Sequence, residues 1–558
     1  MQNLRPESSA WGRWLGLLAV VGMFVGGAAP FLPQQCLWLD EATQMTGLRL
    51  GPTGVARWLA GGEPHDTGQF RDRMPPLSYW LGWVWARAFG FDEASLRWFG
   101  VTCVAVAAAL VYEAARLALG TASAWVAGLL FALCPAVIVL SVEIRAYPLF
   151  VLWSAVAFYG LVRLHATSPD ERRATFAALA LALSAAVSTH FFGAVLGGSM
   201  LATLLILAYR GAGRLRLIVG VGGVFAVTMA SLLPFIIASF AYSKHGITPG
   251  VGYGPRLGGV KNVLVRLVNH VTLSVHRPVA IVAVAAAVVL IVLAIGAARS
   301  SRRPVVAVAL TLGIGLLVVT AAKLALNTFD AASSNYNVWM RPGFCILLSA
   351  GIASQSRAVR RVAALAFGLL LVAQMSGAYQ LAVHGNYFAH GPHRTIAELI
   401  HSLNTRDIAV VHDDPSHRFE FVYCPIRYEL GPGLEHYELV HAPDGSTLVR
   451  DYPARRGVRP VTALPYRYLV VVRSELTNPT NLAAQVRGGE GALGDGPLAR
   501  ALRTSGDWRS VSERLAVAYI ITAKIDLFEC CRPPRQDAPR VTHLKPTAHA
   551  TTSKMRTY

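Results

Sequence analysis

The sequence predicts an α-helical membrane protein that crosses the bilayer many times and ends in a separate α/β domain. Of its 558 residues, 54% are hydrophobic and only 15% are charged, whereas soluble domains usually carry about 25% charged residues. The mean hydropathy is +0.45. Apolar runs near the ~20 residues that span a bilayer recur through the first two-thirds of the chain. After residue 384, short runs rich in Val, Ile and Tyr replace them.

We expect about eleven transmembrane helices, all within residues 1–383. The first apolar run follows Arg5 and Arg13 and is long for a secretory signal, so we interpret it as an uncleaved span. The expected spans lie near residues 12–33, 95–118, 122–142, 147–164, 174–190, 191–209, 217–240, 279–297, 304–326, 338–355 and 362–382.

The basic residues predict the orientation of these spans. The formal net charge is +20, but most basic residues lie in loops between apolar runs, which is typical of cytoplasmic loops and not of a nucleic-acid-binding groove. We therefore expect no nucleic-acid partner. The acidic first loop (34–94) and the C-terminal region should face outside. The cytoplasmic clusters would be Arg163, Arg172 and Arg173; Arg210, Arg214 and Arg216; Arg299, Arg302 and Arg303; and Arg357, Arg360 and Arg361.

One apolar segment, residues 75–90, is not counted as a span. It has only about 16 residues and carries Trp80, Trp83, Trp85 and Arg87. Short length and aromatic crowding favour a helix that lies at the membrane interface. Counting it as a span would invert every later loop and place the arginine clusters outside.

The chain after the last span divides in two. Residues 384–529 are expected to form an extracytoplasmic α/β domain, with a helix at 394–403 and strands near 407–412, 466–473 and 515–528. Residues 530–558 are polar and basic and are expected to be disordered. A disulfide from Cys424 to Cys530 or Cys531 is left open, because these thiols would face an oxidising compartment.

Sidedness limits the chemistry. Neither ATP nor nucleotide sugars are present outside a plasma membrane, so a group-transfer enzyme there needs a donor delivered through the membrane, and a polyprenyl-phosphate sugar fits. Such an enzyme needs a base for the acceptor hydroxyl and cations for the departing phosphate. The sequence offers both near the expected outer face: the carboxylates of Asp40, Glu41 and Asp72, and the cations of Arg97, Arg145, Lys323 and Arg341.

Four short segments occur in a fixed order: WLDEA at 38–42, DRMPPLSY at 72–79, GFDEASLR at 90–97 and SVEIRAY at 141–147. A looser one, YNVWMRP, follows at 336–342. Together they resemble the motifs of the large bacterial relatives of the protein O-mannosyltransferases and the aminoarabinose (lipid A) transferases, which have membrane-embedded GT-C folds. The resemblance covers roughly residues 10–380.

The resemblance implies an inverting glycosyltransferase at the outer face of a bacterial inner membrane. It would move a hexosyl or pentosyl group from a polyprenyl-phosphate donor to a hydroxyl of a lipid, glycan or protein acceptor. Asp40 would be the catalytic base, and Arg145 and Arg341 would bind the donor phosphate. The remaining candidates for donor binding or for support of the site are Glu41, Asp72, Arg97, Glu143 and Tyr147.

Met74 departs from the family pattern, which has His or Lys at this position. Methionine carries no charge and does not bind a hard cation, so we expect no essential metal, although a divalent cation is left open.

Other interpretations are kept beside these. Asp40 could cap a helix that begins at Glu41, and His412 and Asp413 with Asp414 are expected to form an ordinary turn. The competing function is a transporter or flippase of a lipid-linked saccharide, which should place ionisable residues near the middle of its spans.

Overall fold

The computed structural model forms two compact units. One comprises residues 1–35, 43–66 and 70–386, and the other comprises residues 387–558 with 36–42 and 67–69. The described residues are 10–33, 37–62, 72–166, 172–208, 212–246, 277–298, 303–326, 336–354, 356–384, 392–405, 407–413, 425–426, 428, 430, 434–441, 447–452, 457–476, 496–517 and 521–531.

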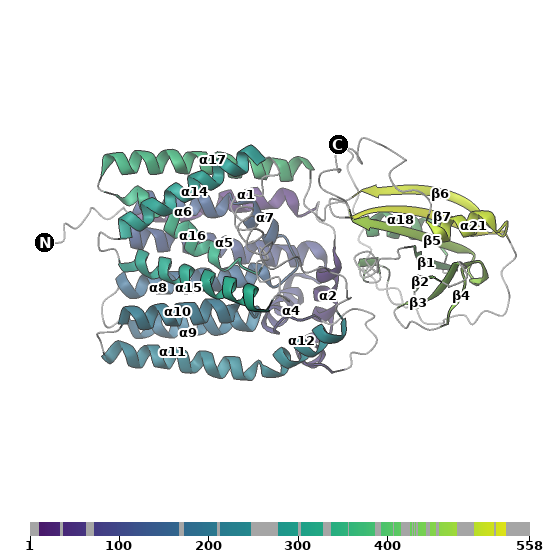
Figure 1. The fold of residues 1–558 in the computed structure, drawn as a ribbon, viewed down its shortest axis with the longest axis horizontal. Coiled ribbons are helices and arrows are strands. Elements are labelled where there is room, and N and C mark those ends of the chain that lie inside the picture. Colours follow the sequence, from purple (N-terminus) through teal and green to yellow (C-terminus); the bar gives the residue numbers. More distant parts are fainter. Residues whose placement is uncertain are drawn as a thin grey trace. The chain divides into compact units, whose positions relative to one another are not determined.

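The first unit is a bundle of helices (Figure 1). In chain order they are α1 (Ala10–Ala28), α2 (Leu39–Arg49), α3 (Gly51–Leu59), α4 (Leu77–Phe89), α5 (Glu93–Leu119), α6 (Thr121–Ala132), α7 (Pro135–Ser141), α8 (Tyr147–Ala166), α9 (Arg172–Thr189), α10 (Gly193–Ala208), α11 (Ala212–Ser231), α12 (Leu233–Gly246), α14 (Arg277–Ala298), α15 (Arg303–Leu326), α16 (Met340–Leu348) and α17 (Arg357–His384).

Every expected span coincides with one helix or with two consecutive helices. Among the described residues, five helices are long and apolar enough to cross a membrane, or up to seven if each of two bent pairs is one span. The chain is therefore a multi-pass membrane protein, while the count of eleven crossings stays a prediction. The bends lie between α6 and α7 (58°) and between α11 and α12 (46°). Pro135 lies just after the first bend and Pro234 just after the second. Both bends are favoured there because proline has no N–H to donate the hydrogen bond that would continue the helix.

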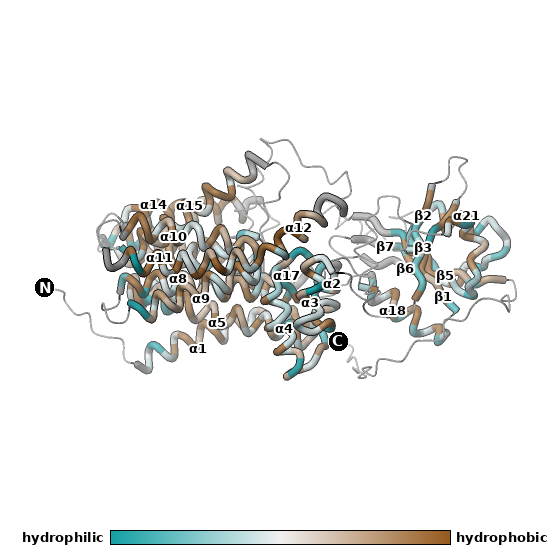
Figure 2. The backbone as a smooth tube through the Cα atoms, turned by 90° about the horizontal axis from the view of Figure 1, so that it is seen from below, coloured by the Kyte–Doolittle hydropathy of each residue, from teal (hydrophilic) through white to brown (hydrophobic). Residues whose placement is uncertain are grey.

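Helix α5 lies at the centre of the bundle, where it packs against α1, α6 and α8. Its buried face carries many alanines, including Ala107, Ala108, Ala114 and Ala115. Small residues let helix backbones approach closely where lipid gives no hydrophobic drive for association. Most helices of the bundle are rich in hydrophobic residues along their length (Figure 2). Some of these residues are exposed on the outside, among them Val219, Ile281 and Leu365. That surface is what a lipid-facing helix bundle requires.

The two ends of the bundle carry different arginines. Helix α9 begins with Arg172 and Arg173 and ends next to His190, and its 18 residues span about 27 Å. His190 packs against Tyr147, whose turn carries Arg145. The arginine cluster therefore lies at the opposite end from Arg145. Helices α2 and α4 also lie at the end away from the N-terminus (Figure 1). Which end faces the cytoplasm stays a prediction.

The second unit is built on a seven-stranded sheet with the order β4-β3-β2-β1-β5-β7-β6. Strand β1 is parallel to its neighbours β2 and β5, and the other pairs are antiparallel. Helix α18 (Pro392–Leu403) packs on one face and α21 (Pro497–Thr504) on the other. The strands are β1 (Ile408–His412), β2 (Glu435–His441), β3 (Thr447–Tyr452), β4 (Arg459–Pro460), β5 (Tyr468–Leu476), β6 (Trp508–Val517) and β7 (Ile521–Cys530).

One strand prediction was wrong. The expected strand at 515–528 is an antiparallel hairpin of β6 and β7, with Val517 opposite Thr522. The sequence between them, Ala-Tyr-Ile at 518–520, contains none of the Gly, Pro, Asn or Asp residues that mark a turn. Since no turn residue interrupts the strand-like sequence, β6 and β7 resemble a single strand in the sequence.

Candidate active site

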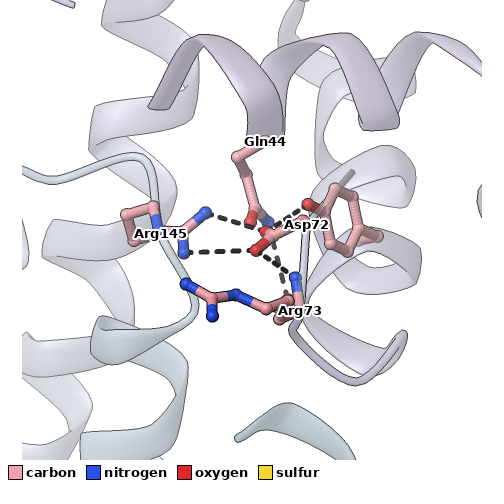
Figure 3. Close-up of polar contacts among 6 residues, drawn as sticks. Gln44, Asp72, Arg73 and Arg145 are labelled. Carbon is pink, nitrogen blue, oxygen red and sulfur yellow. Dashed lines mark hydrogen bonds and ion pairs between the residues drawn. The ribbon is translucent and has the colours of Figure 1, made fainter. Parts of the chain in front are cut away.

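A buried ion pair joins two motifs that are far apart in the sequence. Asp72 precedes α4, and Arg145 lies in the turn between α7 and α8. Nη1 of Arg145 is 2.8 Å from Oδ2 of Asp72, and Nη2 is 3.4 Å from Oδ1. The two side chains are only 3% and 8% exposed. Figure 3 shows the guanidinium of Arg145 facing this carboxylate.

Further donors reach both oxygens of Asp72. The backbone N–H of Arg73 donates to Oδ1 at 2.7 Å, and the hydroxyl of Tyr79 donates to Oδ2. Protein donors thus occupy both oxygens of this carboxylate. Asp72 is therefore well suited to orient Arg145.

Arg97 supports the turn that carries Arg145. Its side chain is 1% exposed, donates from Nη1 to the carbonyl of Val142 at 2.6 Å, and pairs with Glu93 at 3.2 Å. Gly100, one turn further along α5, lies against the same region, since a Cβ there would be 2.4 Å from the carbonyl oxygen of Ser141. In the structure Arg97 thus holds backbone next to the site, as a supporting residue does.

A small cavity adjoins Arg145. Its volume is about 10 Å³, close to the minimum that holds one water. Its polar lining comes from Gln44, Ser78, Glu143 and Arg145. The amide of Gln44 donates to the hydroxyl of Ser78 at 3.5 Å. Glu143 is buried and belongs to the same turn as Arg145. The other lining residues are Leu48, Gly82, Leu96, Phe99, Gly100 and Ile144, so the cavity holds a few polar groups in mostly apolar surroundings.

Asp40 and Glu41 lie in the first turn of α2. Asp40 is half-buried and Glu41 is fully buried. Since α2 begins at Leu39, Asp40 lies inside the helix and not before it, which does not fit the alternative of a cap for a helix starting at Glu41. Residues four apart share one face of a helix, so Asp40 lies one turn before Gln44, a lining residue of the cavity.

The late motif reaches the same end of the bundle through aromatic contacts. The His190 ring lies 5.6 Å from that of Tyr147 and 5.5 Å from that of Tyr336. Arg341, five residues after Tyr336, is buried and donates to the sulfur of Cys134 at 3.2 Å, beside the α6–α7 bend. The structure therefore brings together Asp72, Glu143 and Arg145, places Tyr147 beside them, and puts Arg341 within the bundle.

The comparisons with known proteins agree with this architecture. Residues 73–237 match the family model described as dolichyl-phosphate-mannose-protein mannosyltransferase. The structure is similar to that of ArnT from Cupriavidus metallidurans bound to undecaprenyl phosphate, with a TM-score of 0.55 at 14% identity, covering 93% of this chain and 98% of that one. The chain has the GT-C fold. The resemblance to relatives of the O-mannosyltransferases and aminoarabinose transferases is thereby confirmed.

A second GT-C structure is also similar. The oligosaccharyltransferase AglB from Archaeoglobus fulgidus, in complex with an inhibitory peptide and a dolichol-phosphate, matches with a TM-score of 0.50 at 10% identity, covering 93% of this chain and 88% of that one. No curated protein sequence matches the chain.

Three residues of the candidate site were missed by sequence reasoning: Gln44, Ser78 and Tyr79. Ser78 and Tyr79 lie inside the quoted DRMPPLSY motif, and Gln44 lies one turn after Asp40, so helical spacing could have indicated them. Within the described ranges, no group of three or more His, Cys, Asp or Glu side chains is arranged to hold a metal ion.

The HDD segment at 412–414 has a structural role that the expected turn does not describe. His412 hydrogen-bonds His436 at 3.1 Å, and burial lowers its pKa to about 3. Asp413 accepts from the backbone N–H of Leu498 at 3.2 Å, at the start of α21. Burial raises the pKa of Asp413, and this hydrogen bond opposes the rise. Asp414 lies outside the described residues.

The disulfide left open by the sequence, from Cys424 to Cys530 or Cys531, stays a prediction. Cys530 and Cys531 are free thiols, and Cys424 lies outside the described residues.

Proposed function

We propose that this protein is an inverting glycosyltransferase that moves a sugar from a polyprenyl-phosphate donor to a hydroxyl acceptor at the outer face of the membrane. One observation carries the proposal: a buried Asp72–Arg145 pair beside a small cavity at one end of a GT-C bundle. The mannosyltransferase family match includes Arg145 and begins one residue after Asp72.

The reaction needs one base and one anion site. Asp40 takes the proton of the acceptor hydroxyl as its oxygen attacks the anomeric carbon from the face opposite the phosphate. The bond between that carbon and the phosphate oxygen breaks, and its electron pair leaves with the polyprenyl phosphate. No acid is required for this leaving group, but fixed positive charge stabilises it as it develops.

The two carboxylates near the site have different surroundings, which supports the assignment of the base. Asp72 is engaged by Arg145, Tyr79 and the backbone of Arg73. Asp40 is half-buried, so part of this residue is accessible to solvent. A base must be within reach of the acceptor hydroxyl. The half-buried Asp40 meets this requirement better than the buried Asp72.

The guanidinium groups of Arg145 and Arg341 are the proposed donor-phosphate ligands. Arginine binds phosphate through a planar fork of N–H donors. Two GT-C structures support this donor class, because ArnT was solved with undecaprenyl phosphate and AglB with a dolichol-phosphate.

The transporter alternative finds less support. Asp72, Glu143 and Arg145 gather at one end of the bundle, whereas a transporter is expected to hold its ionisable residues near the midplane.

The test is Asp40→Asn in the full-length protein, reconstituted in lipid nanodiscs with a panel of polyprenyl-phosphate hexoses and pentoses. Release of polyprenyl phosphate by mass spectrometry is the readout. We expect a loss of roughly 10²–10⁴-fold, the usual contribution of a positioned acid–base group. Asp92→Asn is the matched control, since Asp92 caps α5 by accepting from Ser95 N–H at 2.9 Å. Near-normal release by Asp40→Asn would remove Asp40 from the role of base.

Sidedness has its own test. Reporter fusions after residue 384 should be active only for a reporter that requires export. An active cytoplasmic reporter at that position would place the proposed site on the wrong side of the membrane.

A further inference from the structure

The Asp72 carboxylate is held by a hydroxyl that the proposed chemistry does not use. The Tyr79 hydroxyl donates to Oδ2, the same oxygen that Nη1 of Arg145 contacts at 2.8 Å. Tyr79 is fully buried, and Asp72 and Arg145 are nearly so. A carboxylate between two donors in a water-poor site has one orientation, because any rotation would break one of the two contacts.

The tyrosine ring is itself fixed. It lies edge-on to Trp58 with ring centroids 6.3 Å apart, and it packs against α2 so closely that a Cβ on Gly47 would be 2.4 Å from Cε1 of the ring. The hydroxyl is therefore placed by packing, and the ring does not depend on Asp72 for its position. The packed Tyr79 ring therefore fixes the position of Asp72, and Asp72 in turn orients Arg145.

We infer that Tyr79 is a positioning residue for donor-phosphate binding, which it serves by fixing Asp72 and, through Asp72, the guanidinium plane of Arg145. This inference rests on the proposed function, since it takes Arg145 as a phosphate ligand. A planar fork binds phosphate only in a limited range of orientations. If Arg145 were tilted, it would keep its charge but could form only one of the two hydrogen bonds to the phosphate.

Tyr79→Phe tests the inference with little disturbance, because it removes only the hydroxyl and leaves the packed ring. The measurement is equilibrium binding of undecaprenyl phosphate to the full-length protein in nanodiscs. A hydrogen bond to a charged group contributes enough that its loss should weaken binding by about tenfold. Unchanged or tighter binding would overturn the inference.

A double-mutant cycle separates positioning from a general effect. Lysine has no planar fork for Asp72 to align, so in the Arg145→Lys background Tyr79→Phe should cost less than about twofold. An equal cost in both backgrounds would show that Tyr79 acts elsewhere, because independent sites are additive. Thermal unfolding of Tyr79→Phe should match that of the wild type.

Tyr112→Phe is the matched control. Tyr112 is also fully buried, but it lies fifteen positions after Arg97 on α5, about 22 Å towards the other end of the bundle. The Tyr112→Phe variant should bind undecaprenyl phosphate as tightly as the wild type. Failure of the proposed function looks different: the wild type would not bind undecaprenyl phosphate, or Arg145→Lys alone would bind as well as the wild type.

Discussion

The two ends of the helix bundle each hold a buried carboxylate in an ion pair, but they are built differently. At one end, Glu113 of α5 pairs with Arg116 one turn later at 2.7 Å and with Arg13 of α1 at 3.0 Å. All three residues lie within continuous helices. At the other end, Asp72 and Arg145 lie outside helices, in a loop and a turn.

This difference separates a structural ion pair from a candidate catalytic one. The Glu113 cluster contains Arg13, whose side chain is 42% exposed, and it joins two helices. The Asp72–Arg145 pair is almost fully buried and borders a small cavity. Tyr79 holds the Asp72 side chain, and Arg97 and Gly100 lie against the irregular backbone before Arg145. Irregular backbone inside a membrane protein is tolerated where protein covers it or where it lines a cavity. Its presence at one end points to function there.

The largest difference in activity between variants of the two ends should come from replacing arginine by lysine. Arg145→Lys and Arg341→Lys keep charge but lose bidentate phosphate contacts, so each should lower donor kcat/KM by about 10–100-fold. Arg116→Lys, the counterpart at the other end, should keep nearly full activity. Steady-state kinetics with the identified donor checks this. Full activity in both site variants would erase the functional distinction between the ends.

A smaller effect, on stability alone, is expected from Glu113→Gln. It leaves Arg13 and Arg116 without their carboxylate, and we expect a loss of about 2 kcal/mol in the free energy of unfolding, since Glu113 is mostly buried. Thermal unfolding in detergent measures the change. Undecaprenyl phosphate binding by the folded fraction should be unaltered, and weakened binding would mean that the two ends communicate.

The smallest effect is expected from Arg13→Ala. Because this side chain is 42% exposed, its ion pair is largely screened and should contribute no more than about 1 kcal/mol. Glu113 also keeps Arg116. A loss of stability as large as that of Glu113→Gln would show that α1 depends on this single contact.

Much of the bundle could be predicted because hydropathy is a local property. Each apolar run marks a helix without knowledge of its neighbours. The second unit was harder. Its parallel core strands β1 and β5 are apolar runs and were predicted, whereas β2, with Glu435, His436 and Glu438, is too polar to be recognised as a strand. The hairpin of β6 and β7 has no turn residue to divide it.

The motifs indicated residues of the candidate site but not the contacts between them. Asp72 and Arg145 were found by motif, yet their pairing joins positions 73 residues apart, and no local pattern reports it. The expected neighbours Glu143 and Arg145 share a turn, but the partner of Arg145 in the ion pair is Asp72. The contact of Arg341 with Cys134 spans 207 positions and was likewise invisible.

Gly100 turns this geometry into a diagnostic for related chains. Only a hydrogen fits between α5 and the carbonyl of Ser141, since a Cβ would be 2.4 Å from that oxygen and 3.1 Å from a carbon of Pro148. A paralogue that keeps Asp40, Asp72 and Arg145 but carries a larger residue at position 100 must shift the whole 141–147 segment. Such a copy would keep all the motifs but place Arg145 differently. In a genome with several GT-C chains, we therefore expect position 100 to separate chains that can hold this arrangement from chains that cannot.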